Sequence, residues 1–176
     1  MADLRLVCDG LRFPEGPIAM DDGTVVVVEI QSGTLARVSP DGGVTRVATT
    51  RGGPNGAAIG PDGKVYVCNN GGFEWAEFNG MTAPGPQPAD YIGGRIQRVD
   101  IDTGEVEDLY TECDGFGLRG PNDIVFDDLG GFYFTDHGMT LQSGREAALT
   151  GIYYAKADGS SIKEIVFPAH EPNGIG

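Results

Sequence analysis

The sequence has little of what several classes of protein require. Twelve Lys and Arg residues stand against 26 Asp and Glu residues, which gives a formal net charge of −14, and the basic residues form no cluster. Nucleic acid and anionic membrane surfaces are therefore poor partners. No apolar run approaches the roughly 18 residues of a membrane-spanning helix. The N-terminus also shows no signal-peptide pattern.

Cysteine and histidine are scarce as well. The three cysteines, Cys8, Cys68 and Cys113, are widely spaced and form no CxxC pair. We interpret them as reduced core thiols of a cytoplasmic protein, in preference to a disulfide or a metal site. The two histidines, His137 and His170, do not favour a zinc site. We interpret His170 as structural.

Glycine and proline, by contrast, are abundant. The chain has 29 glycines and 11 prolines, and 40% of its residues are hydrophobic. That apolar content argues against a disordered chain. Such a density of turn-forming residues favours many short strands joined by tight turns over a helical bundle.

A short motif recurs four times along the chain. An Asp/Gly turn and a β-rich run follow each of the first three copies in the same order, which is the signature of an internal repeat. The copies are Pro14-Glu15-Gly16, Pro54-Asn55-Gly56, Pro121-Asn122-Asp123 and Pro172-Asn173-Gly174. This repetition is the strongest structural signal in the sequence.

Each of the first three repeats is compatible with four antiparallel strands. Four strands per repeat of this length are typical of a β-propeller blade. A β-sandwich fits less well, because it gives no reason for the same tripeptide before every fourth strand. We predict strands over 17–20, 24–30, 34–39 and 44–48, then 57–59, 64–68, 94–100 and 105–110, then 124–126, 132–135, 152–157 and 162–167.

The sequence therefore predicts an all-β protein, a β-propeller of four-stranded antiparallel blades. About three blades cannot close a ring of the usual four to eight. We expect the chain to be the N-terminal part of a longer propeller; the alternative is a ring completed by several copies that associate through open blade edges. We place blade one over 13–50, blade two over 51–115, blade three over 116–170 and the start of the next blade over 171–176.

The motifs are expected to meet at one end of the propeller. We predict that each lies on the link between blades, just before the strand that lines the central channel, so that Glu15, Asn55, Asn122 and Asn173 converge at one mouth. Two long insertions, 70–92 and 136–150, should overhang the same mouth. Long loops of this kind are often functional. We interpret them as a lid or wall of a site, with surface elaboration as the alternative.

One carboxylate and two or three amide oxygens at a single point suit a hard divalent cation. Calcium prefers six to eight oxygen ligands from carboxylates, amides and water. Glu15 is the firmest candidate, because a carboxylate between Pro and Gly is not needed for a turn. The alternative for the asparagines is that they only stabilise turns, and for Asn55 that alternative is the stronger one.

The sequence resembles the SMP-30/gluconolactonase family. The resemblance runs from about Phe13 to the end of the chain and is carried by the motif at 13–17, the Pro-Asn-Gly at 54–56 with Pro61-Asp62-Gly63, the Pro-Asn-Asp at 121–123 with Phe134-Thr135-Asp136, and the last Pro-Asn-Gly. It implies a six-bladed β-propeller that hydrolyses sugar-type lactones with a divalent metal. Ca²⁺ is favoured, and Zn²⁺, Mg²⁺ and Mn²⁺ stay open.

The resemblance also implies roles for single residues. Glu15, Asn122 and Asn173 match the metal ligands, with Asn55 supporting them. The general base is expected to be an Asp beyond Gly176. It would act on water that attacks the metal-activated carbonyl.

Substrate contacts are expected from Arg119, Asp123 and His137. The alternatives are surface charge for Arg119, a turn acceptor for Asp123 and an exposed loop position for His137. Two other functions stay open for the whole protein: hydrolysis of other esters or phosphotriesters at the same site, and a propeller that binds calcium without catalysis.

Overall fold

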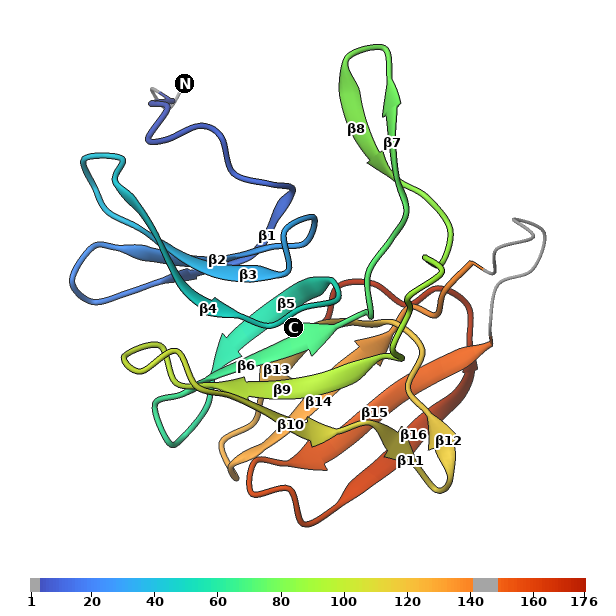
Figure 1. Cartoon of the computed structure of the whole chain (residues 1–176). Helices are drawn as coiled ribbons and strands as arrows, with labels where there is room; N and C mark the ends of the chain where they lie inside the picture. The colour runs from blue at the N-terminus through green and yellow to red at the C-terminus, as the bar shows by residue number, and fades with distance from the viewer. Residues whose placement is uncertain (1–3, 141–148) are drawn as a thin grey trace.

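The structure is a computed structural model that describes residues 4–140 and 149–176. Within those ranges the chain forms sixteen strands and no helix, so it contains no helix able to cross a membrane. Twelve of the strands build three four-stranded antiparallel sheets, and the other four form two small hairpins. The three sheets follow one another as propeller blades, as Figure 1 shows, and the predicted fold is confirmed.

The first sheet is a simple meander. Its strands pair in chain order, and they are β1 (Pro14–Ala19), β2 (Val25–Glu29), β3 (Thr34–Val38) and β4 (Val44–Thr49). The four consecutive valines of β2 are buried except at the first position, as expected for β-branched residues in a strand that is covered on both faces. This sheet agrees with the sequence prediction to within a few residues at each strand.

The second sheet has the same meander with an insertion. Its strands are β5 (Pro54–Ile59), β6 (Val65–Asn69), β9 (Arg95–Val99) and β10 (Val106–Tyr110). Between β6 and β9 the chain forms a hairpin of β7 (Trp75–Phe78) and β8 (Met81–Pro84), which projects from the sheets in Figure 1. The sequence predicted the insertion, but not its strands.

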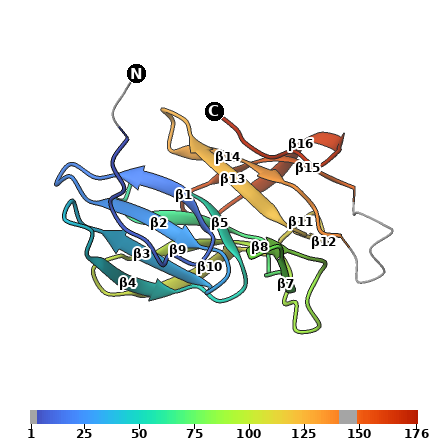
Figure 2. The ribbon, with the colours of Figure 1, turned by 90° about the horizontal axis from the view of Figure 1, so that it is seen from above.

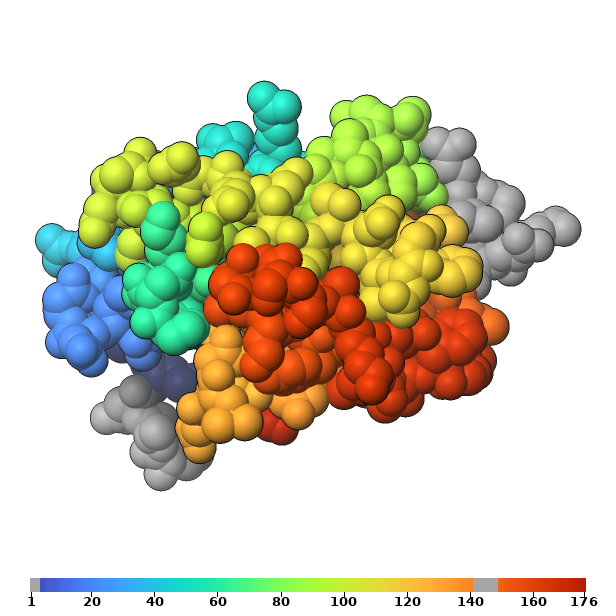
Figure 3. Space-filling view, turned by 90° about the horizontal axis from the view of Figure 1, so that it is seen from below, coloured from blue at the N-terminus to red at the C-terminus, as the bar shows by residue number. Residues whose placement is uncertain are grey.

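The third sheet consists of β13 (Pro121–Phe126), β14 (Gly131–Asp136), β15 (Thr150–Lys156) and β16 (Ile162–Ala169). A second hairpin, β11 (Glu112–Cys113) with β12 (Phe116–Gly117), precedes it and was not predicted. Most of the predicted insertion at 136–150 lies outside the described residues. In the space-filling view the sheets form one continuous body, from the blue first sheet to the red end of the third (Figure 3).

Apolar side chains hold neighbouring sheets together. The layer between the first and second sheets is rich in valine, whereas the layer between the second and third is aromatic, with Tyr66, Phe132 and Phe134 fully buried. Cys68 and Cys113 are buried free thiols in the aromatic layer, as predicted. Cys8 is half-buried and packs beside a third small cluster on the first sheet.

The first three repeated motifs do not lie on links between blades, and for them that part of the prediction is wrong, whereas the fourth motif, at 172–174, lies outside any strand after β16. Pro14, Pro54 and Pro121 are the first residues of the strands β1, β5 and β13. Near the beginning of each strand the register against the second strand of the sheet shifts by one residue, between Glu15 and Ile18 in β1, between Pro54 and Ala57 in β5 and between Pro121 and Ile124 in β13. Such a bulge re-aims side chains and interrupts the ladder. The motif is thus the bulged beginning of a strand rather than a free turn.

Candidate functional site

A cavity of about 370 Å³ lies where the three sheets meet, and we call it the mouth cavity. It is the place predicted for the site, since it brings together the motifs of all three blades and the last motif. Six of the predicted residues line it, namely Glu15, Asn55, Asn122, Asp123, His137 and Asn173. The predicted convergence of the motifs is therefore a feature of the structure.

Close backbone approach at two motif glycines explains the convergence. A Cβ added to Gly16 would lie 2.6 Å from the carbonyl oxygen of Asn55, and one added to Gly56 would lie 2.5 Å from that of Asn122. Each glycine therefore lets its strand touch the motif of the next blade. β1 contacts β5, and β5 contacts β13, and the three strands can be followed in Figures 1 and 2. Residues of all three strands line the cavity.

The candidate ligand side chains are not committed to bonds within the protein. Glu15 is exposed, and its carboxylate accepts only a long bond of 3.4 Å from the Gly16 amide. Across residues 4–140 and 149–176, the side-chain amides of Asn55, Asn122 and Asn173 have no hydrogen-bond partner. Oxygen atoms that line a cavity without partners are available to a ligand.

A buried polar residue lies opposite the proline of each of the first three motifs. The prolines Pro14, Pro54 and Pro121 pair with the last residue of the second strand in their sheet. Those partners are fully buried, and they are Glu29, Asn69 and Asp136. Sequence reasoning missed them, although each is a polar residue that ends an apolar strand at the same place in its repeat.

The three buried residues have a common task, which is to hold the backbone just before the motif. Glu29 accepts the Arg12 amide at 2.8 Å, and Asn69 accepts the Gly53 amide at 3.0 Å. Asp136 accepts the backbone amides of Gly120 at 2.7 Å and of Arg119 at 2.8 Å. We call Glu29, Asn69 and Asp136 the anchors, because each fixes the entry into its motif.

The pKa values of the two acidic anchors are shifted in opposite directions. Burial acts to raise the pKa of Glu29, but hydrogen bonds from the Arg12 amide, Arg46 and Thr34 outweigh it, and the pKa is lowered overall. Burial also acts on Asp136, and there it prevails over three backbone amides, so the pKa of Asp136 is raised. Glu29 also has the Arg46 guanidinium in contact at 2.8 Å, whereas the hydrogen bonds that Asp136 accepts come from backbone amides.

The third and fourth motifs are joined by hydrogen bonds. The Asp123 carboxylate accepts the Ile175 amide at 3.0 Å, and the Asp123 amide donates to the Thr135 hydroxyl at 3.1 Å. That hydroxyl in turn donates to the backbone carbonyl of Asn173. Asp123 is therefore an acceptor that holds the last motif in place, in addition to lining the mouth cavity.

An aromatic wall covers one side of the mouth cavity. Phe13 and Phe73 line the cavity, and Trp75 packs on both, with ring centroids at 5.0 Å and 6.0 Å. Phe73 and Trp75 belong to the inserted segment of blade two, and Pro84 of the same segment also lines the cavity. The insertion therefore forms one wall of the mouth cavity, and its role as a lid or wall of a functional site stays a prediction.

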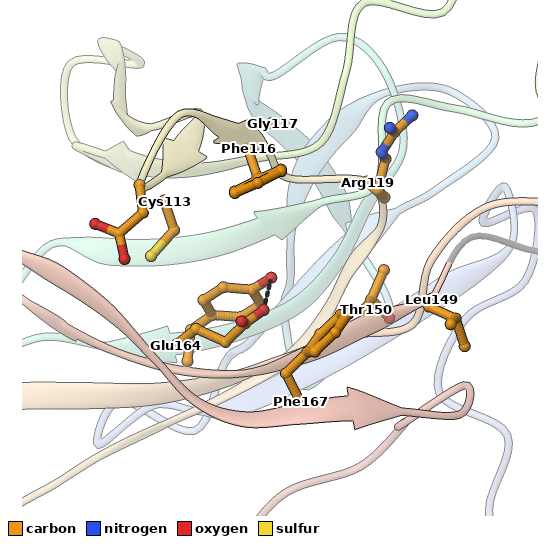
Figure 4. Close-up of a pocket in the computed structure, with 10 residues that line it drawn as sticks. Cys113, Phe116, Gly117, Arg119, Leu149, Thr150, Glu164 and Phe167 are labelled. Carbon is orange, nitrogen blue, oxygen red and sulfur yellow. Dashed lines mark hydrogen bonds between the residues drawn. The ribbon is translucent and has the colours of Figure 1, made fainter.

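Arg119 lies elsewhere. It lines a separate cavity of about 310 Å³ between the β11–β12 hairpin and the third sheet, which we call the outer cavity. In Figure 4, Arg119 and Glu164 lie on opposite sides of that cavity. His137 does line the mouth cavity, where its Nδ1 is 3.2 Å from the Glu171 carbonyl, and His170 is exposed.

The residues of the mouth cavity fit a hard cation. Glu15 supplies a carboxylate, Asn122 and Asn173 supply amide oxygens, and none of these groups has to break a strong internal bond to bind. In the part of the chain that the structure describes, no cluster of three His, Cys, Asp or Glu residues could hold a metal. An oxygen set with amides is the kind that calcium accepts.

Known proteins agree with this architecture. Residues 13–176 match the family described as SMP-30/Gluconolactonase/LRE-like region. The chain belongs to this family. A lactonase, drp35, from Staphylococcus epidermidis is 27% identical over 99% of the chain and 46% of its own length. A gluconolactonase from Zymomonas mobilis is 24% identical over 98% of the chain and 48% of its own length.

The chain thus spans about half the length of the curated relatives it matches. Among solved structures, a gluconolactonase from Xanthomonas campestris superposes with a TM-score of 0.69 at 21% identity, over 94% of this chain and 51% of that one. A nidogen/laminin complex superposes with a TM-score of 0.62 at 20% identity, over 93% and 52%. These superpositions support the fold alone, because proteins that share a fold can have different functions.

Proposed function

We propose that the whole protein is a metal-dependent hydrolase that opens the ester bond of a sugar-type lactone. The observation that carries the proposal is the set of uncommitted oxygen atoms of Glu15, Asn122 and Asn173 around one cavity. Relatives named lactonase and gluconolactonase support the same reaction class. The substrate would be a small molecule, as the size of the mouth cavity suggests.

Glu15, Asn122 and Asn173 would hold the cation, which we take to be Ca²⁺. When bound, it supplies a positive charge that polarises the lactone carbonyl. Glu15 contributes the one full negative charge of this set. The side chains of Asp123 and His137 line the same cavity and would bind substrate hydroxyls, while the aromatic wall limits access of water on one side.

The base that activates water is proposed to be the Asp expected beyond Gly176. Calcium lowers the pKa of bound water less than zinc does, so a separate carboxylate is required. Glu15 is a poor substitute, because it would have to leave the cation in order to accept a proton. We also propose a cytoplasmic location on the ground of the free thiols Cys68 and Cys113.

The test uses the whole protein with gluconolactone as the probe. We expect Glu15→Gln to lower kcat/KM roughly 100-fold or more and to weaken Ca²⁺ binding, because a ligand charge is lost. Glu105→Gln is the matched control: it removes one exposed carboxylate in a turn of the second blade and should leave both quantities unchanged. A chelator should abolish activity, and added Ca²⁺ should restore it.

Other outcomes would point to other functions. Tight Ca²⁺ binding without turnover of any lactone would favour a calcium-binding propeller. Turnover of phosphotriesters or other esters in preference to lactones would favour a different hydrolase at the same site. Activity that survives both the chelator and Glu15→Gln would overturn the proposal.

A further inference from the structure

Two neighbouring side chains at the end of β14 link the groups around the mouth cavity. Thr135 is 2% exposed and Asp136 is 0% exposed. Because a buried polar group needs hydrogen-bond partners, their contacts are set by the protein rather than by solvent. Neither residue lines the mouth cavity, so neither would touch a substrate there.

Asp136 joins two segments on either side of the site. Its Oδ2 accepts the Arg119 amide at 2.8 Å, and its Oδ1 accepts the amides of Gly120 at 2.7 Å and Gly138 at 2.9 Å. Gly120 stands two residues before Asn122, and Gly138 directly follows His137. One carboxylate therefore fixes the backbone that carries both of these cavity-lining side chains.

Thr135 makes the corresponding link to the last motif. Its hydroxyl accepts the Asp123 amide at 3.1 Å and donates to the Asn173 carbonyl. Asp123 follows Asn122 in the sequence, so the hydroxyl connects the backbone of the two candidate amide ligands. It uses its single proton and one lone pair, and both bonds are internal.

We infer that Thr135 and Asp136 are positioning residues that set the relative placement of Asn122, His137 and Asn173. Residues that orient ligands are worth roughly 10-fold to 100-fold in metal affinity or activity. The catalytic part of this inference rests on the proposed function. The geometric part stands on the five hydrogen bonds alone.

The experiment compares Asp136→Asn with Asp127→Asn in the whole protein. Asp127 is the matched control, because it also accepts two backbone amides, those of Leu129 and Gly131, both at 2.8 Å, and a hydroxyl from Tyr154 at 3.0 Å. It lies in the same blade at the turn between β13 and β14, at the other end of β14 from Asp136. Loss of stability alone should therefore affect both variants.

We expect Asp136→Asn to raise the Kd for Ca²⁺ at least 10-fold and to lower kcat for gluconolactone, with Asp127→Asn within twofold of the wild type in both. Thr135→Val, which keeps the shape and removes the hydroxyl, should raise the Kd several-fold and serves as the test if Asp136→Asn does not fold. Kd values within twofold of the wild type for the folded variants would overturn the inference.

A failure of the proposed function can be told apart from a failure of this inference. If the wild type neither binds Ca²⁺ nor hydrolyses a lactone, the proposed function fails. Amide hydrogen exchange then tests the positioning itself: Asp136→Asn should accelerate exchange at Arg119, Gly120 and Gly138, whose amides Asp136 accepts, and Asp127→Asn should not. Unchanged exchange at these amides would overturn the geometric part as well.

Discussion

Blades one and three both hold the backbone before their motif with a buried carboxylate, but the two carboxylates have different hydrogen-bond partners. Each places a buried carboxylate at the end of its second strand, opposite the motif proline. In blade one, Glu29 accepts two bonds from the Arg46 guanidinium, at 2.8 Å and 3.0 Å, in addition to the Arg12 amide. In blade three, Asp136 accepts three backbone amides.

The two buried carboxylates differ in how favourable their ionised form is in the folded protein. Burial acts to raise the pKa of both carboxylates, and hydrogen bonds to the ionised form act to lower it. In Glu29 the hydrogen bonds prevail, including those from Arg46, whereas in Asp136 burial prevails over three backbone amides. The ionised form is therefore less favourable for the anchor of blade three than for the anchor of blade one.

The largest loss of stability should come from a substitution at the third position of the motif. This position is Gly16 in blade one and Asp123 in blade three. Gly16→Ala is expected to destabilise the protein by about 3 kcal/mol, because its Cβ would lie 2.6 Å from a backbone oxygen of Asn55 at a φ of +52°. Urea unfolding measures the loss. Gly63→Ala is the control, since it has a φ of +76° but open space, and should cost about 1 kcal/mol.

If Gly16→Ala and Gly63→Ala cost the same, the close contact between blades does not matter. Asp123 shows why blade three differs at this position. Its side chain extends toward the last motif, where it accepts the Ile175 amide at 3.0 Å, so a side chain is accommodated there. The same position therefore serves contact between blades in blade one and a link to the next motif in blade three.

The next effect concerns the anchor of blade one. Glu29→Gln should lower the free energy of unfolding at neutral pH by about 2 kcal/mol, because hydrogen bonds to a buried charge are lost. Since the pKa of Glu29 is lowered from 4.5, its contribution is full above that value and is lost as the pH falls through the folded-state pKa. The stability difference between wild type and variant should thus shrink in acid.

Glu107→Gln is the control for the anchor of blade one. Glu107 pairs with Arg98 at 2.6 Å, but with 54% of its side chain exposed, and such surface pairs contribute less than about 1 kcal/mol. Equal losses for Glu29→Gln and Glu107→Gln would show that burial does not strengthen the pair of blade one.

The anchor of blade three should show the opposite dependence on pH. The pKa of Asp136 is raised from 3.8 by burial, so the folded state binds the proton more tightly than the unfolded state does. As the pH falls through the raised pKa, the wild type should gain stability relative to Asp136→Asn. Unfolding curves for both proteins across the acidic range measure this, and slopes of the same sign for the two anchors would contradict the comparison.

Much of the fold could be predicted from the sequence, because runs of β-branched residues indicate strands and Asp/Gly pairs indicate the turns between them. The valine run gave strand β2 almost to the residue, and the Asp/Gly turns separated the strands of each blade. The two missed hairpins carried a signal as well. Asn79-Gly80 and Asp114-Gly115 both adopt positive φ at each residue, the conformation of a two-residue hairpin turn.

The anchors and the placement of the motifs could not be predicted in the same way. Pro-Asn-Gly is a turn sequence by local propensity, and only pairing with the second strand makes it the bulged start of a strand. Glu29 or Asp136 alone looks like an ordinary polar residue at a strand end. Its role depends on strand register and on contacts across the sheet, which are tertiary facts.

A smaller effect is expected from the aromatic wall. Trp75→Ala removes the ring that packs on Phe13 and Phe73, and each such aromatic contact contributes about 1 kcal/mol. We expect KM for gluconolactone to rise roughly 10-fold with little change in Ca²⁺ affinity. Phe78→Ala, at the exposed tip of the same hairpin, should change neither value. An equal rise for both variants would show that the wall does not shape the site.

The smallest effect on KM should come from replacing the Arg119 side chain. Arg119 in blade three can be compared with Arg12, which has the equivalent position in blade one. Arg12 and Arg119 each stand two residues before the motif proline, and each donates its backbone amide to the anchor of its blade. The side chain of Arg119 lines the outer cavity rather than the mouth cavity. Arg119→Ala retains the amide, so KM for gluconolactone should change less than about twofold.

A much larger rise in KM for Arg119→Ala would mean that the guanidinium reaches the substrate after all, as the family resemblance implied. The position would then act through its side chain in blade three and through its backbone in blade one. Arg12→Ala provides the reference, since it also keeps the amide that Glu29 accepts at 2.8 Å. Equal, small effects of the two variants would show that both blades use only the backbone at this position.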